Sequence, residues 1–224
     1  MAKAEMTLKI KTIDERLAEG RSYRNIDVSA FERRAEESGE MSVEGYATVF
    51  DTPYELWSDG EYTVLEQIDA RAFDDTDMSD VIMQYNHEGR VFARTSNGTL
   101  AVRPDMKGLF IRARLDGTEL GRQVYEEING GYTTKMSFGF RVLEDKREIT
   151  ENREEGTVTV LRTITKIEKL YDVSAVSLPA NDATSISARN YSEGVIAEIA
   201  EEFRAREARE RQKQKIRILT EVLS

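Results

Sequence analysis

Alternation of apolar and polar positions dominates the chain from about residue 41 and predicts short β-strands. The stretches SVEGYATVF, YTVLEQI and DVIMQYNH are rich in β-branched and aromatic residues, and the turn DMKG separates GTLAVRP from GLFIRARL. Strand patterns resume in TTKMSFGFRVL, TVTVLRTITKIEKL and VSAVSLPA. We therefore expect a mainly β (α+β) fold with flanking helices, built as a small closed β-barrel of about seven strands.

Helical spacing appears in three places. IDERLAEG predicts a short helix ended by Gly20, and GTELGRQVYEEINGG predicts a longer one ended by Gly130 and Gly131. From residue 192 the chain consists mainly of good helix formers, with an apolar cluster at Val195 to Phe203 and another at Ile216 to Leu223. The first cluster should pack on its own domain. The second would lie up to about 30 Å further along a continuous helix and needs another surface.

These patterns divide the chain into three parts. Residues 1–40 are charged and weakly patterned and form an N-terminal extension. Residues 41–191 carry the strands and form the main domain, and residues 192–224 form a C-terminal helical arm.

Composition excludes several kinds of chemistry. The chain has no cysteine and one histidine, so disulfides, thiolate catalysis and the usual zinc sites are excluded, and we expect no cofactor or metal. The net charge of −10 disfavours binding to nucleic acid backbones. No stretch approaches the roughly 20 apolar residues of a membrane span, and the N-terminus lacks the apolar core of a secretion signal. We expect a protein of the cytoplasmic type that binds no membrane.

The strand TTKMSFGF places a hydroxyl beside a glycine. Side chains alternate between the faces of a strand, so Met136 and Phe138 face one way while Ser137 and Gly139 face the other. A glycine allows close approach by another chain segment, which favours a nucleophilic serine beside a substrate cleft. An ordinary serine on a half-exposed strand fits the same pattern.

A serine nucleophile requires a base and a group that orients the base. His87 is the only histidine, and an unperturbed imidazole suits general base catalysis near neutral pH. Asp172 enters an otherwise apolar strand in KLYDVSAVSLPA, where an acid should be paired. The alternatives are a structural histidine at a strand end and an aspartate on an edge strand facing water.

The ordered set EGYATVFDTP, EQIDARAFDD, YNHEG, GTLAV, GLFIRARLDGTELGRQVYEEINGGYTTKMSFGF and LYDVSAVSLPANDAT resembles the prohead proteases of tailed bacteriophages. The resemblance covers roughly residues 43–190. It implies a serine endopeptidase with a fold like the herpesvirus assemblins, with Ser137 as nucleophile, His87 as general base and Asp172 as the third residue. The family often has glutamate at the position of Asp172, and aspartate is one methylene shorter.

The resemblance also implies a setting. Such proteases act inside the immature phage head, the prohead, in the host cell cytoplasm, and they cleave the scaffolding segment of the major capsid protein and often themselves. The partners would then be the capsid protein and further copies of this chain in a homo-oligomer, and the second apolar cluster of the arm would meet one of them. The alternative for the arm is a tail removed by self-cleavage. The alternative for the whole chain is a noncatalytic scaffold or assembly protein that keeps the barrel. The sequence does not single out oxyanion donors, for which backbone amides, with Arg141 or Arg189, are the candidates.

Overall fold

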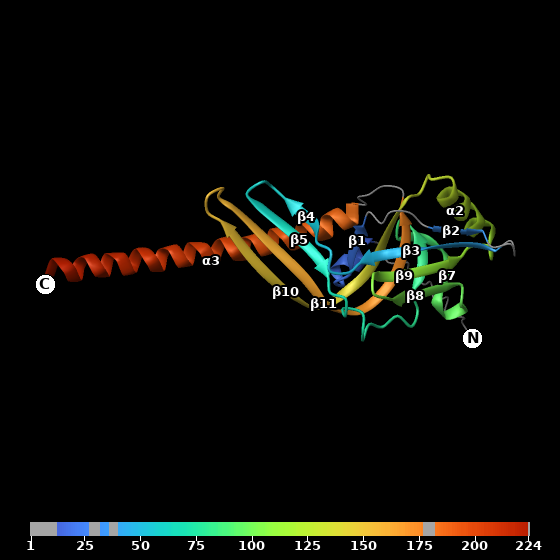
Figure 1. Ribbon diagram of the computed structural model, residues 1–224, viewed down its shortest axis with the longest axis horizontal. Helices are drawn as coiled ribbons and strands as arrows, with labels where there is room; N and C mark the ends of the chain where they lie inside the picture. Colours follow the sequence, from blue (N-terminus) through green and yellow to red (C-terminus); the bar gives the residue numbers. More distant parts are fainter. Residues whose placement is uncertain (1–12, 27–31, 36–39, 177–181, 224) are drawn as a thin grey trace, which may run out of the picture.

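The protein is mainly β with helices at its edges. The structure, a computed structural model, describes residues 13–26, 32–35, 40–176 and 182–223 (Figure 1). Over these ranges the strands are β1 (Ser22–Ile26), β2 (Glu32–Ala35), β3 (Met41–Val49), β4 (Tyr54–Ser58), β5 (Tyr62–Ile68), β6 (Ile82–Tyr85), β7 (Glu88–Arg94), β8 (Leu100–Pro104), β9 (Gly108–Arg114), β10 (Lys135–Asn152) and β11 (Thr157–Val176). The helices are α1 (Ile13–Ala18), the 3-10 turn η1 (Thr95–Asn97), α2 (Glu119–Asn129) and α3 (Asp182–Leu223).

The strands form two sheets. One has the order β1-β10-β11-β5-β4, with β6 also pairing with β11 and β7 pairing with β6; the other has the order β2-β3-β9-β8. The mainly β prediction is confirmed. The strand pairing gives two sheets and does not by itself define a closed barrel, so the barrel stays a prediction. The division of the chain into three domains also stays a prediction.

Two expectations about the strands are corrected. The expected count of about seven is too low, because the described part of the chain holds eleven strands, including β4 and β7, which the strand patterns did not predict. The segments TVTVLRTITKIEKL and VSAVSLPA belong largely to one continuous strand, β11. The N-terminal extension also carries β1 and β2, which add an edge strand to each sheet. Tertiary pairing, which the weak local pattern does not reveal, stabilises these two strands.

A long antiparallel ribbon of β10 and β11 forms the centre of the larger sheet. Their register runs from Lys135 opposite Val176 to Asn152 opposite Thr157, with four shifts between Gly139 and Asp145. Such bulges bend a ribbon and increase its twist. One end of the ribbon therefore lies in the core while its hairpin projects away from it (Figure 1).

The main core lies between the two sheets and beneath α2. Its fully buried side chains include Phe73, Met83, Leu109, Ile111, Phe138, Phe140 and Leu170. Helix α2 begins at Thr118, whose hydroxyl accepts a hydrogen bond from the Gly121 amide at 2.9 Å, and it buries Val124 and Ile128. It ends before Gly131, whose φ of 76° favours glycine. The predicted end of this helix at Gly130 and Gly131 is confirmed.

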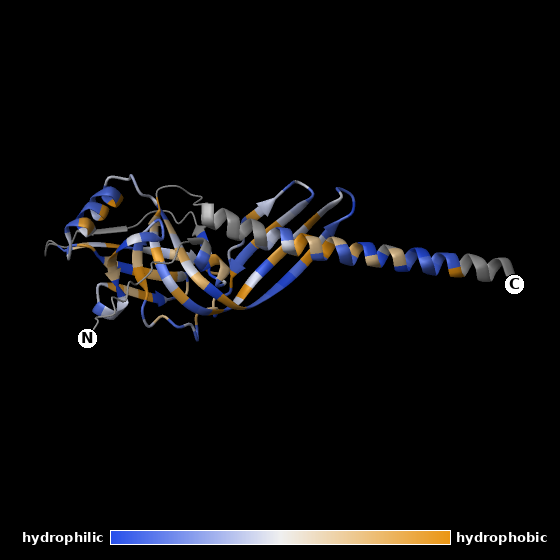
Figure 2. Cartoon of the chain, turned by 180° about the vertical axis from the view of Figure 1, so that it is seen from behind, coloured by the Kyte–Doolittle hydropathy of each residue, from blue (hydrophilic) through white to orange (hydrophobic). Residues whose placement is uncertain are grey.

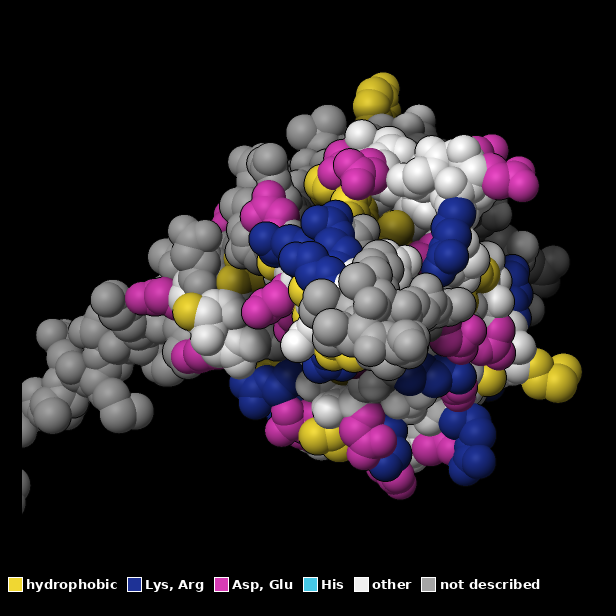
Figure 3. Space-filling model, turned by 90° about the vertical axis from the view of Figure 1, so that its left-hand side faces the viewer, with side chains coloured by type: hydrophobic (Ala, Val, Ile, Leu, Met, Phe, Trp, Pro, Cys, Tyr) yellow, Lys and Arg dark blue, Asp and Glu magenta, His cyan; other side chains and the backbone are white. Residues whose placement is uncertain are grey.

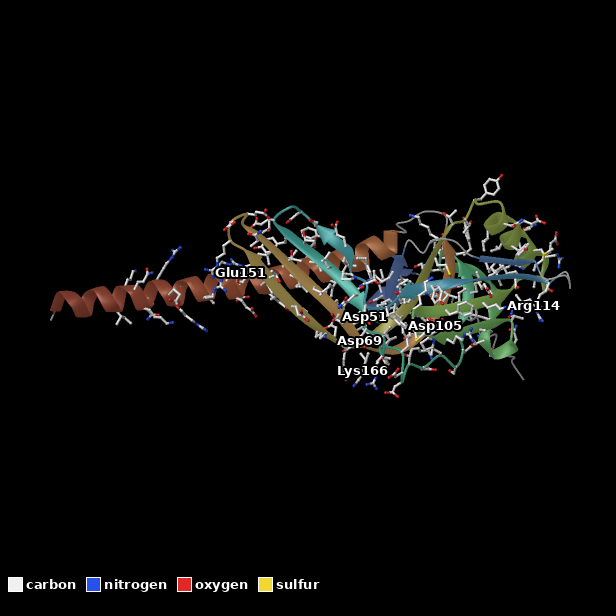
Figure 4. All side chains as sticks on the ribbon, in the orientation of Figure 1. Asp51, Asp69, Asp105, Arg114, Glu151 and Lys166 are labelled. Carbon is white, nitrogen blue, oxygen red and sulfur yellow. The ribbon has the colours of Figure 1, made fainter. Side chains whose placement is uncertain are left out.

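Among the side chains that the structure describes, those of helix α3 that pack in a core lie no further along than Phe203. The helix begins ten residues before the predicted arm, at Asp182. The first apolar cluster is confirmed as a packing surface: Val195 and Ile199 are buried in a second core with Val64, Val158 and Val160. Arg206 pairs with Glu151, which Figure 4 labels on the β10–β11 ribbon, at 2.8 and 3.0 Å.

Beyond these contacts α3 extends past the sheets (Figure 1), and its colours in Figure 2 are mostly hydrophilic. Residues 208–216 are exposed, as predicted for the charged stretch. Ile216 is 57% exposed, and the side chains of Leu219, Val222 and Leu223 lie outside the described residues. Basic and acidic side chains are interspersed on the molecular face at this end (Figure 3). Over the described residues, no helix is long and apolar enough to cross a membrane.

A buried charge network joins β1 to the larger sheet. Glu66 on β5 is fully buried and contacts Arg24 at 2.5 and 3.0 Å, Arg162 at 2.7 Å and the Tyr54 hydroxyl at 2.5 Å. Burial alone would raise the pKa of Glu66, but the two guanidinium groups outweigh it and lower this pKa to about 2. The network is fully paired, which is the condition under which buried charges are tolerated.

We predict that this network makes stability depend on pH in the acid range. The folded pKa of Glu66 is about 2 against an ordinary value of 4.5, so its contribution is complete above 4.5 and is lost as pH falls toward 2. The shift corresponds to about 3 kcal/mol. Denaturant unfolding between about pH 6 and pH 3 should show this loss.

Glu66→Gln should lower the free energy of unfolding by about 3–5 kcal/mol at neutral pH, because Arg24 loses its buried counter-charge and Arg162 keeps only the partly exposed Asp145. The free energy of unfolding of this variant should also change much less than that of the wild type as the pH falls. Glu61→Gln, on an exposed carboxylate, is the matched control and should behave like the wild type. If stability falls equally with pH in the wild type and in Glu66→Gln, the network is not the cause of the pH dependence.

Candidate active site

His87 lies in a tight turn between β6 and β7. Asn86 and His87 are its two loop residues, with φ of 49° and 61°, and Tyr85 pairs with Glu88 across it. Positive φ at both loop residues is what a type I′ hairpin requires, and asparagine suits the first position. A histidine in the second position is uncommon and carries strain, which the surroundings must offset.

The surroundings hold the backbone of this turn. The Asn86 amide donates to the Ala175 carbonyl at 3.0 Å, and the His87 amide donates to the Ser174 hydroxyl at 3.2 Å. Arg16 from α1 donates to the His87 carbonyl at 2.9 Å. Both backbone groups of His87 are therefore hydrogen-bonded, which fixes the direction of its ring.

The imidazole of His87 lies between Asp172 and Ser137. Nδ1 of His87 is hydrogen-bonded to Oδ1 of Asp172, and Nε2 is 2.5 Å from the Oγ of Ser137. Because a carboxylate only accepts hydrogen bonds, Nδ1 must donate its proton to Asp172. In the neutral imidazole Nε2 is then the acceptor and receives the hydroxyl proton of Ser137.

Three segments far apart in sequence bring these groups together. Ser137 lies on β10, Asp172 on the neighbouring β11 and His87 on the turn after β6, which itself pairs with β11. The expectation that Asp172 is paired holds, and the alternative of an edge-strand carboxylate is wrong, because β11 is central and Asp172 is 1% exposed. Its shorter side chain reaches His87 without a bridging group.

Gly139 provides the room for Asp172. A Cβ at this position would lie 2.4 Å from Oδ2 of Asp172 and 2.8 Å from the ring of Tyr23. The sequence pattern predicted close approach by another chain segment. The structure shows that two side chains approach the glycine, and one of them is the carboxylate that contacts His87.

The alternative of an ordinary serine on a half-exposed strand is wrong. Ser137 and His87 are both fully buried. Tyr23 from β1 lies with its ring edge to the imidazole, at 4.5 Å between centroids. Burial and the Asp172 charge raise the pKa of Tyr23, so its phenol is neutral beside the imidazole. The covering residues come from the N-terminal segment, which the strand pattern did not mark.

An open pocket of about 330 Å³ reaches this site from the side of Asp172. Its lining includes Arg16, Arg21, Gln84 and Tyr171 but neither His87 nor Ser137. Arg141, a candidate oxyanion donor, instead donates to the Glu19 carbonyl at 2.8 Å, and the side chain of Arg189 lies outside the described residues. Across the described ranges, no group of three or more possible metal ligands gathers.

This arrangement is that of a serine hydrolase, and the comparison with known families is specific. Residues 29–197 match the family described as caudovirus prohead serine protease. The chain belongs to this family. It is a serine protease with a role in phage capsid maturation, as the resemblance implied.

Two further comparisons add little. The bacteriophage T4 capsid assembly protease, gp21, is a solved structure with 12% identity to this protease, and the alignment covers 70% of this chain and 96% of that one. Its TM-score of 0.36 is too low to support an argument. No curated protein sequence matches the chain.

Sequence reasoning selected the three side chains that the structure brings into one hydrogen-bonded chain, and it missed the side chains around them. Ser174 accepts from the His87 amide and donates to Asp172 at 3.2 Å. It is two residues from Asp172 on the same strand face, so the alternation itself carried a signal. Arg16 and Tyr23 come from a weakly patterned segment, and only the tertiary structure places them at the site.

We predict that Gly139→Ala inactivates the protease without unfolding it. The added methyl must displace the Asp172 carboxylate or the Tyr23 ring, at a cost of about 1–3 kcal/mol, which a folded domain tolerates. The rate should fall by at least about 100-fold, because misplaced groups lose catalytic orientation. Peptide cleavage and a thermal melt measure the two effects.

Gly117→Ala is the matched control, since a Cβ there meets nothing within 4 Å. It should retain wild-type activity. A fully active Gly139→Ala protein would show that the carboxylate position does not matter for the reaction.

Proposed function

We propose that this protein is a serine endopeptidase that cleaves the scaffolding segment of the major capsid protein, and itself, inside the prohead in the host cytoplasm. The observation that carries the proposal is the hydrogen-bonded chain from Ser137 through His87 to Asp172. Membership in the prohead protease family supports the setting. The proposal includes an assemblin-like barrel as the fold.

In the proposed reaction Ser137 is the nucleophile. Its Oγ attacks the peptide carbonyl carbon while Nε2 of His87 takes the hydroxyl proton. Nε2 then gives that proton to the leaving nitrogen, the C–N bond breaks, and an acyl-enzyme remains. Water, deprotonated by the same nitrogen, releases the acyl group and restores the hydroxyl.

Asp172 has two tasks in this proposal. Its hydrogen bond keeps the proton of His87 on Nδ1, so that the lone pair of Nε2 points at Ser137. Its negative charge also stabilises the imidazolium that forms when the serine proton moves. In a buried site this stabilisation is stronger than in water.

The arm supports a proposal about partners. Its first half is held on the sheets by the second core, whereas its charged stretch is solvated. We propose that the apolar cluster from Ile216 to Leu223 binds another copy of the chain or the scaffolding segment of the capsid protein. A long helix gains most of its stability from such packing.

We predict that Ser137→Ala abolishes capsid protein cleavage, with a loss of about 10⁵-fold or more, because no nucleophile remains. Co-expression with the capsid protein, followed on a gel, measures this. Ser42→Ala, which removes another buried hydroxyl, is the control and should cleave normally. Processing by Ser137→Ala at the wild-type rate would favour a noncatalytic assembly protein.

Asp172→Asn should reduce kcat/KM by roughly 10³- to 10⁴-fold, less than the loss of Ser137. An asparagine amide that donates to Nδ1 would shift the imidazole proton to Nε2, which then cannot accept from the serine. Asp80→Asn, near the same pocket, is the control. A near-normal Asp172→Asn enzyme would remove Asp172 from the mechanism.

Truncation after Phe203 should leave the fold intact, because Phe203 is the last residue that packs in the second core. Light scattering should show fewer chains in each particle than for the full-length protein, and incorporation into proheads should fall. A truncated protein with an unchanged number of chains per particle and normal incorporation would mean that the distal arm binds no partner.

A further inference from the structure

The N-terminal clasp, defined as residues 13–26, lies across the strand that carries Ser137. It consists of α1, the turn after it and β1 (Figure 1). β1 pairs antiparallel with β10, so that Asn25 lies opposite Ser137 and Tyr23 opposite Gly139. The other edge of β10 pairs with β11. Both edges of the nucleophile's strand are therefore occupied.

An extended substrate peptide needs one of these edges. Peptides commonly bind to enzymes and adaptor domains by adding a strand to an open sheet edge, where main-chain hydrogen bonds hold them. The scissile carbon must come within about 3–3.5 Å of the nucleophile. A fully buried hydroxyl does not allow this approach, and the pocket beside Asp172 does not include Ser137 in its lining.

We propose that β1 occupies the position in which the substrate strand binds, and that the clasp keeps the protease inactive until β1 leaves β10. A substrate peptide would then pair antiparallel with residues 136–140 in place of β1. This inference rests on the proposed function, because it concerns access to the proposed nucleophile.

The contacts of the clasp make the closed form the ground state. Arg16 binds the His87 carbonyl, and Arg21 lies over the Tyr171 ring with its guanidinium carbon 3.7 Å from the centroid. Arg141 binds the Glu19 carbonyl from β10. On the opposite face of β1, Arg24 makes the buried pair with Glu66. The clasp is thus fastened on both faces of its strand.

The clasp also lies outside the part of the chain that carries the family's features. The match to the prohead serine proteases begins at residue 29 and includes His87, Ser137 and Asp172. The clasp ends at Ile26. The groups that perform the proposed chemistry therefore belong to the matched region, and the segment that covers them precedes it.

Two of the fastening contacts can be removed without touching the proposed catalytic groups or Glu66. Arg21→Ala removes the contact with Tyr171, and Arg141→Ala removes the bond to the Glu19 carbonyl. Arg103→Ala is a matched control, because Arg103 lies over the ring of Phe110 at 4.8 Å on the other sheet. All three variants replace an arginine by alanine; Arg103 is exposed, and Arg21 and Arg141 are half-buried.

The experiment uses the full chain and a fluorophosphonate probe, which reacts with an accessible, activated serine hydroxyl. Deuterium uptake by β1 measures the opening of the clasp in the same proteins. Each single variant should label Ser137 roughly two- to fivefold faster than the wild type, and the double variant about tenfold faster, in proportion to uptake by β1. Arg103→Ala should match the wild type, and Ser137→Ala should not be labelled.

If β1 takes up deuterium faster in the double variant but Ser137 is labelled more slowly or at the same rate, the inhibitory role of the clasp is wrong. Strand β1 would then stabilise the site and not block it. Rapid labelling of the wild type with β1 fully protected would also overturn the inhibitory role. Absence of labelling in every protein, including the double variant with an open β1, would instead overturn Ser137 as nucleophile and with it the proposed function.

Discussion

The pairing of β10 with β11 is the constraint on which the rest of the structure depends. At one end of the ribbon it sets Gly139 opposite Asp172 and Ser137 opposite Ser174, so that hydroxyl and carboxylate groups share one buried location. The parallel pairing of β6 with the same stretch of β11 then brings the turn of His87 over them. A slip of one residue in either register would turn these side chains to the other face.

The same ribbon carries the outer part of the molecule. Its bulges bend it away from the core, and its far end pairs with β5 and supports the first half of α3. Two kinds of buried contact thus serve two purposes. Apolar packing attaches the arm, whereas the paired charges of Arg24, Glu66 and Arg162 fix β1 against the sheet. Because an unpaired buried charge is costly, that second attachment is specific.

The position of β1 connects stability with control of access. Strand β1 pairs beside the fully buried Ser137, and the ring of its Tyr23 contacts the imidazole of His87. A segment that blocks access to a site must be stable when it is docked and must not contain the groups that react. The proposed clasp meets both requirements.

The sequence by itself determined the mainly β class, helix α2 with the glycines that end it, and the apolar cluster that holds α3. These features follow from local periodicity, which a single chain records directly. Ser137, His87 and Asp172 could also be selected, because the chain has one histidine and few serines beside a glycine on a buried strand, and because the ordered motifs resemble a known family.

Tertiary structure alone decided which residues cover Ser137, His87 and Asp172 and how the strands pair. Strand β1 has a weak local pattern, and it forms because the edge of β10 and the carboxylate of Glu66 provide its partners. The burial of Ser137, the room that Gly139 leaves for Asp172 and the union of two predicted strands in β11 likewise depend on segments far apart in sequence. Local spacing cannot record such contacts, because their energy comes from neighbours that only folding brings together.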